Sequence, residues 1–185
     1  MKKIILILLF TIFSATKLVY CQNSTDKLQW SAKNKLTVND FLLKTKSIER
    51  ISSFAQFSFD YKIHGFDFLT KNFNKKVFNS VIKTASWIDT TSNFKQSLIY
   101  QQTLFDIAEI YTRQFRKALK NNRKQIIKGF EITEELHNKI MTAFSVRRIE
   151  YDRETKFSSD LEKQKVWESL IEKELMDLND FAFEK

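Results

Sequence analysis

The residue types that most often carry chemistry are scarce in this chain. Its 185 residues include two histidines, His64 and His137, and one cysteine, Cys21. Neither histidine has a neighbouring histidine or cysteine in the sequence, and a lone histidine is more typical of a structural or exposed position than of a metal ligand. With two glycines and no GxSxG, Walker or GxGxxG motif, the chain offers no support for nucleophilic or nucleotide chemistry.

Acidic side chains are the remaining candidates, and they occur in two segments. Asp106 and Glu109 lie in the first segment, and Asp152 and Glu154 lie in the second. Carboxylate oxygens bind hard cations, so these residues would form a cation site if the two segments meet. The alternative is a structural role, with Glu109 and Arg113 forming an i,i+4 ion pair on a helix surface or at a helix junction. We favour the structural interpretation.

Both acidic segments resemble motifs of a known family. The stretch Ser97–Arg113 reads SLIYQQTLFDIAEIYTR and resembles the HEQxHFDIxE helix of a secreted bacterial domain-of-unknown-function family that is regarded as zinc-dependent peptidases. The stretch Tyr151–Phe157 reads YDRETKF and, with Gln164 and Trp167 after it, is similar to the family's YDxETxH segment and QxxW helix. The resemblance extends from about Leu28 to Leu178.

The resemblance implies a zinc site whose ligands are missing here. In an HExxH helix, two histidines four residues apart bind one zinc and the glutamate activates the bound water. Tyr100 and Leu104 stand at the two histidine positions, Gln101 stands at the base position, and Phe157 stands at the third-ligand position. Leucine and phenylalanine cannot coordinate zinc, and glutamine has no carboxylate to accept a proton. The resemblance therefore implies loss of the metal–water mechanism at this location.

The same substitutions predict a filled pocket. Leu104 and Phe157 would place apolar volume where polar ligands stood, and burial stabilises such a side chain by about 1.5 to 3 kcal/mol. In a zinc site, nearby acidic residues orient the histidine ligands. The resemblance implies that the residues around the former ligands are retained here, namely Asp106, Glu109, Arg113, Asp152 and Glu154.

We therefore expect a pseudo-peptidase, secreted or periplasmic, with no catalytic residue, metal or cofactor, that binds or scaffolds an unknown protein or envelope partner. One alternative keeps a hydrolase that uses a divergent acidic or polar site around Tyr100 and Gln101. Another is a lipid-anchored envelope component, which requires lipidation of Cys21.

The elements that must position these residues show clear periodicity. Apolar residues alternate with polar ones from Ala55 to Ile63, which predicts a strand, and Gly65 permits a turn into a shorter strand at 66–69. A third strand is predicted at 76–87, and a short one at 28–31.

Helices are predicted in the second half of the chain. Apolar spacing predicts one helix at about 93–122 and a second from Thr133 to about Glu150, with Ile149 facing inward. A third helix is predicted from Asp160 to about Leu178, and its broad apolar face is suited to covering a sheet. Strands followed by helices indicate an α+β domain, with a small antiparallel sheet of about three to four strands packed against three helices.

The N-terminus predicts export. Lys2 and Lys3 precede an apolar run that Lys17 interrupts before the roughly 20 residues of a membrane span, which is typical of a cleaved signal peptide at 1–21 and a single domain at 22–185. The formal net charge of +9 includes these lysines, and the other basic residues are spread along the chain. Because no basic stripe forms, we expect no nucleic-acid partner, and the mature chain is expected to have no transmembrane helix.

Overall fold

The structure is a computed structural model that describes residues 26–46, 51–63, 67, 70, 73–91, 93–129 and 131–183. It confirms the α+β class. Its strands and helices are β1 (Lys27–Gln29), β2 (Leu43–Lys44), β3 (Ser53–Tyr61), β4 (Val77–Ile88), α2 (Phe94–Asn121), α3 (Arg123–Ile126), α4 (Glu131–Thr155) and α5 (Leu161–Asp177). The predicted signal peptide, Cys21, His64 and Gly65 lie outside the described residues, as do all residues of the predicted 66–69 strand except Asp67.

The sheet is built around β4. β3 pairs antiparallel with β4 from Ser53 to Tyr61, with one irregularity, whereas β1 and β2 pair with different stretches of β4. β1 is antiparallel to β4, but β2 is parallel to it, with Leu43 opposite Trp87. The sheet is therefore mixed, and the prediction of a purely antiparallel sheet is wrong for this two-residue strand.

A bulge interrupts the long β3–β4 pair. The register passes from Phe54 opposite Trp87 to Gln56 opposite Ile82, so residues 83–86 of β4 have no partner residue on β3. The Ser86 hydroxyl fills the gap, because it donates to the Ile82 carbonyl at 2.6 Å and accepts from the Gln56 amide at 3.0 Å. Backbone groups that lose a ladder partner at a bulge are satisfied here by this side chain.

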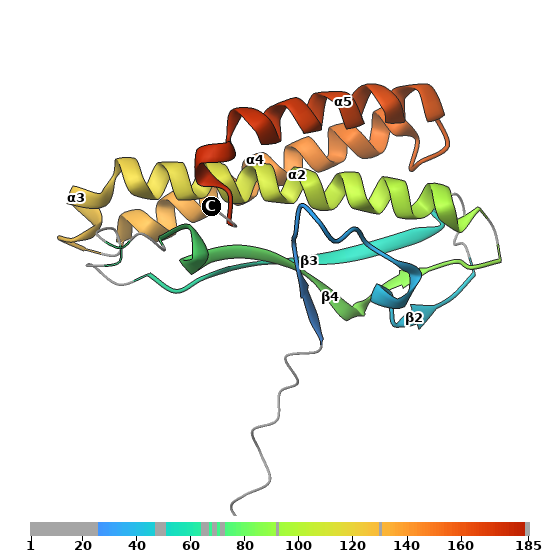
Figure 1. The fold of residues 1–185 in the computed structure, drawn as a ribbon, viewed down its shortest axis with the longest axis horizontal. Coiled ribbons are helices and arrows are strands. Elements are labelled where there is room, and N and C mark those ends of the chain that lie inside the picture. The colour runs from blue at the N-terminus through green and yellow to red at the C-terminus, as the bar shows by residue number, and fades with distance from the viewer. Residues whose placement is uncertain are drawn as a thin grey trace, which may run out of the picture.

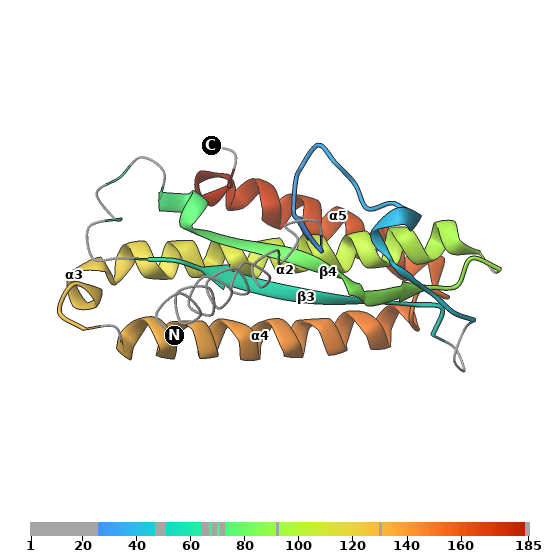
Figure 2. The same cartoon turned by 90° about the horizontal axis from the view of Figure 1, so that it is seen from below.

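The helices form two layers above the sheet. α2 runs lengthwise over β3 and β4, α4 lies beside α2, and α5 lies on the side of these helices that faces away from the strands (Figures 1 and 2). Trp167 and Ile171 of α5 are buried, but Leu161, Val166 and Leu170 are exposed. The prediction that α5 covers the sheet is therefore wrong, because it covers the helix layer instead.

Periodicity predicted the helices well, with one error of orientation. α2 and α5 match their predicted ranges closely, and α4 extends beyond its predicted range at both ends. Phe144 of α4 is buried and packs edge-on against Phe57 of β3, as the inward face requires. Ile149 does not face inward, because it is 67% exposed. Among the described residues, no helix is both long enough and apolar enough to cross a membrane.

Candidate functional site

The three α2 residues at which the resemblance places the zinc ligands and the base are buried in the protein. Tyr100, Gln101 and Leu104 are 4%, 1% and 0% exposed. The Tyr100 ring stacks on Tyr151 of α4 with centroids 5.1 Å apart, and its hydroxyl donates a hydrogen bond to the Asp152 carboxylate. Burial, followed by the adjacent Asp152 charge, raises the pKa of the Tyr100 phenol, so this hydroxyl stays protonated at neutral pH and can donate a hydrogen bond.

Gln101, which the resemblance places at the base position, faces β3. Its amide nitrogen donates to the Ser53 hydroxyl at 3.0 Å. Its amide oxygen is buried and has no hydrogen-bond partner among the described residues, which is a costly arrangement for a polar atom. Leu104, one turn further along α2, belongs to the main hydrophobic core together with Phe57 and Phe105.

Phe157 does not fill the expected pocket. It is 38% exposed and lies in the turn between α4 and α5. Its backbone φ is 54°, and the neighbours Lys156 and Ser158 have φ values of 50° and 80°. Three consecutive residues in the left-handed region form a strained turn, since side chains other than glycine disfavour it. The prediction that Leu104 and Phe157 both occupy core volume is thus correct for Leu104 and wrong for Phe157.

The residues matching the YDxET and QxxW motifs join three helices. The Tyr151 hydroxyl donates to the Gln164 amide oxygen at 2.6 Å and lies 3.2 Å from the Tyr100 carbonyl oxygen. Gln164 in turn donates to the Thr103 hydroxyl of α2 at 2.9 Å. Tyr151 and Gln164 are 0% and 2% exposed, so this network is inside the protein, where satisfied polar groups fix one packing arrangement.

Asp106 and Glu154 have separate partners. Asp106 accepts from the indole nitrogen of Trp30 at 2.7 Å and from Gln102 at 2.8 Å. Glu154 accepts from the indole nitrogen of Trp167 at 2.9 Å. Burial raises the pKa of the Asp106 carboxyl. Each carboxylate therefore fixes an aromatic side chain to a helix.

Glu109 is the centre of a buried ion cluster. Its Oε1 accepts from Arg113 Nε at 3.0 Å and from Arg116 Nη1 at 2.8 Å. The expected i,i+4 pair therefore exists, and it lies at a helix junction, since Arg113 also donates to the Leu175 carbonyl in the last turn of α5. Arg116 is 0% exposed and donates twice to the Val77 carbonyl of β4. The cluster joins α2, α5 and the sheet.

The acidic residues do not gather into a cation site. Within the described ranges, no group of three or more histidine, cysteine, aspartate or glutamate side chains is arranged to hold a metal ion. His137 of α4 lies between aromatic rings, with centroid distances of 5.2 Å to Tyr61 and 5.6 Å to Phe115. These contacts give it a packing role.

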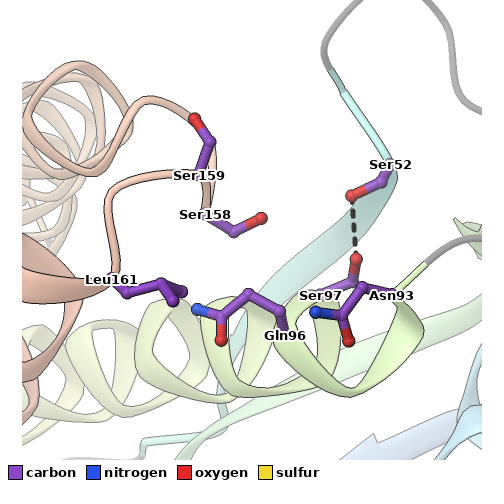
Figure 3. Close-up of a pocket in the computed structure, with 7 residues that line it drawn as sticks. All are labelled: Ser52, Asn93, Gln96, Ser97, Ser158, Ser159 and Leu161. Carbon is purple, nitrogen blue, oxygen red and sulfur yellow. Dashed lines mark hydrogen bonds between the residues drawn. The ribbon is translucent and has the colours of Figure 1, made fainter.

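A polar pocket lies one helical turn before Gln101. It has a volume of about 390 Å³ and opens at the start of α2, where the turn between α4 and α5 approaches β3 (Figure 3). Ser97 precedes Gln101 by one helical turn and bonds to the Ser52 hydroxyl at 2.8 Å. The lining residues are Ser52, Asn93, Gln96, Ser97, Ser158, Ser159 and Leu161.

Sequence reasoning did not single out these lining residues. Ser52, Ser97 and Ser158 are far apart in the chain, and serine is common in loops and at helix starts. One signal was available, because Ser97 opens the segment that resembles the zinc helix and lies four residues before Gln101. That spacing places both side chains on one face of a helix.

Comparison with family models, with curated proteins and with solved structures finds no match to this chain.

Proposed function

We propose that this chain is an exported pseudo-peptidase that binds a ligand or partner and does not hydrolyse peptides through a metal. The observation that carries the proposal is the state of the zinc-helix positions. Leu104 is fully buried in the core, and the Tyr100 hydroxyl is bonded to Asp152, so neither position presents a metal ligand to solvent. The open polar pocket beside them offers hydrogen-bonding groups for recognition.

A hydrolase with a divergent acidic site is less well supported. Such an enzyme needs its acid, base and nucleophile within hydrogen-bond reach of one substrate. Tyr100 contacts Asp152, whereas Asp106 contacts Trp30 and Glu154 contacts Trp167. Each of these polar side chains is therefore held by a different partner, and the three carboxylates do not point toward one common substrate position.

Hydrolysis of an unstructured protein tests the proposal. Purified mature protein is incubated with casein in the presence of zinc, with and without a chelator, and the fragments are separated by mass. We expect the casein to remain intact in both samples. Cleavage that requires zinc and stops with the chelator would refute the pseudo-peptidase proposal.

Export is a separate part of the proposal. The intact mass of the protein from its native host would show removal of residues 1–21, with Gln22 as the new N-terminus. A mass that retains Cys21 with added acyl chains would support the lipid-anchored alternative instead.

A further inference from the structure

We propose that the polar pocket at the start of α2 binds a carboxylate group that carries an apolar substituent. This inference names a ligand class for the pocket and rests on the binding role proposed above. It depends on three features of the pocket, which are its unused hydrogen-bonding groups, its charge and the apolar surface at its rim.

The first feature is a set of polar groups that lack protein partners. Ser158 is 8% exposed, and its hydroxyl makes no hydrogen bond to another described residue. Figure 3 shows this hydroxyl directed into the space between the turn after α4 and the start of α2. The side-chain nitrogen of Gln96 is buried and has no hydrogen-bond partner among the described residues. A buried donor without a partner is costly, so a ligand that accepts from the Gln96 nitrogen would be stabilised, and the Ser158 hydroxyl can donate to the same ligand.

Ser52 and Ser97 add a further donor. Their hydroxyls share one hydrogen bond of 2.8 Å, in which either oxygen can donate. Two hydroxyl groups carry two hydrogens, so one remains for a ligand. The Ser159 hydroxyl is already used, because it donates to the Lys156 carbonyl at 2.6 Å. The Gln96 nitrogen can only donate, and the serine hydroxyls can donate as well as accept, so a ligand with acceptor oxygens can use all of these groups.

The second feature is the charge of the pocket. Among the described residues that line it, none is charged. The pocket lies at the N-terminal end of the 28-residue helix α2, whose first turn has no acidic residue and whose N-cap Asn93 makes no side-chain capping bond. Such a helix end carries about half a positive charge. This charge suits a single carboxylate better than a phosphate dianion, which usually recruits arginine or lysine.

The third feature is apolar surface at the rim. Leu161 lines the pocket and is 54% exposed. An apolar group attached to the carboxylate would bury part of this surface, and the pocket volume of about 390 Å³ lies within the range of small-ligand sites. The C-terminus of a peptide and a free branched-chain acid both have this chemistry.

Titration by NMR of the full mature protein tests this inference. The probes are N-acetylleucine, N-acetylleucinamide and a short acetylated peptide that ends in a leucine carboxylate. We expect the acid to bind with a Kd on the order of 1 mM or tighter, and the amide to bind at least about tenfold more weakly. Tighter binding of the peptide than of N-acetylleucine would identify a peptide C-terminus as the source, and equal binding would identify a small acid.

Two variants remove the proposed contacts. Ser158→Ala and Gln96→Met each remove one unpartnered group, and each is expected to weaken acid binding about tenfold. Ser145→Ala is the matched control, since Ser145 is exposed on α4 and its hydroxyl donates to the Met141 carbonyl of its own helix. With two variants, a folding failure of one leaves the test intact.

Three results would overturn the inference. These are no binding of either acid, equal binding of acid and amide, and wild-type affinity in the folded pocket variants. Because the casein assay is independent of this pocket, failure of carboxylate binding in a protein that does not cleave casein would remove this inference and leave the pseudo-peptidase proposal standing.

Discussion

The Tyr100 hydroxyl of α2 donates a hydrogen bond to the Asp152 carboxylate of α4, at the position where the family resemblance places the first zinc ligand. This contact joins the two segments that carry the resemblance. The Tyr100 ring also stacks on Tyr151, so the aromatic residue is held from two directions. A residue in this environment contributes to the packing of α2 against α4.

Removal of the Tyr100 hydroxyl should destabilise the protein. Tyr100→Phe leaves the partly buried Asp152 carboxylate without this donor, and we expect a loss of about 1 kcal/mol in the free energy of unfolding measured with urea. Tyr111→Phe is the control, because Tyr111 packs against Phe144 and donates no hydrogen bond to a described residue. Its effect should be below about 0.5 kcal/mol. Equal effects of the two substitutions would contradict a role for this hydrogen bond.

The buried ion cluster should be far more sensitive than a surface ion pair. Glu109→Gln leaves the charges of Arg113 and Arg116 inside the protein without a carboxylate, which should cost about 3 to 5 kcal/mol of unfolding free energy. Glu150→Gln removes an exposed partner of Arg147 and should cost less than about 1 kcal/mol. Thermal and urea unfolding of both variants measures the difference. A cost for Glu109→Gln as small as for Glu150→Gln would show that the cluster is open to water.

Leu104 and Phe157 should respond differently to truncation. Leu104→Ala creates a cavity in the core and should cost about 2 to 5 kcal/mol. Phe157→Ala removes a partly exposed ring from a strained turn and should cost less than about 1 kcal/mol. Urea unfolding of the two variants compares these costs directly. Similar large losses would mean that Phe157 fills core volume, as its place in the sequence motif suggested.

The stability of the protein should depend on pH through Asp152. Burial raises the pKa of this carboxyl above its usual value of 3.8, so the folded state disfavours the charged form. The resulting destabilisation of the folded state is absent well below pH 3.8, where Asp152 is protonated in both the folded and the unfolded state. It is complete once the pH exceeds the raised pKa of the folded state.

Asp152→Asn removes this titration and keeps an oxygen that can accept from Tyr100. The unfolding free energy of the wild type, relative to this variant, should fall as the pH rises from acid to neutral. Denaturant unfolding at a series of pH values measures the difference. A rise with pH would mean that the hydrogen bond from Tyr100 and the charge of Arg148, 3.9 Å from the carboxylate, together dominate over burial.

Local periodicity accounts for the part of the fold that the sequence predicts. The apolar spacing of α2 and the alternation in β3 arise within single elements, and the structure places both at nearly the predicted residues. β2 could not be predicted in this way, because Leu43 and Lys44 become a strand only by pairing with Trp87 and Ile88 of β4. Such pairing depends on tertiary contacts.

The site was predicted less completely than the fold. The motif position of Phe157 suggested burial, but the left-handed backbone of residues 156–158 turns the chain and leaves its ring partly exposed. The pocket combines serines from the residue before β3, the first turn of α2 and the turn after α4. These three segments are far apart in the sequence, and no spacing pattern connects them. Chemistry assembled from distant segments requires the structure.

We propose that Tyr100, Gln101 and Leu104, which the resemblance matches to a zinc helix, lie in the protein interior and bind no metal. The most direct measurement is the zinc content of the mature protein after dialysis against excess zinc and then against metal-free buffer. We predict far less than one zinc per chain, and the same value for the folded Tyr100→Phe variant. One tightly retained zinc per chain would contradict the account, particularly if its loss on chelation also unfolded the protein.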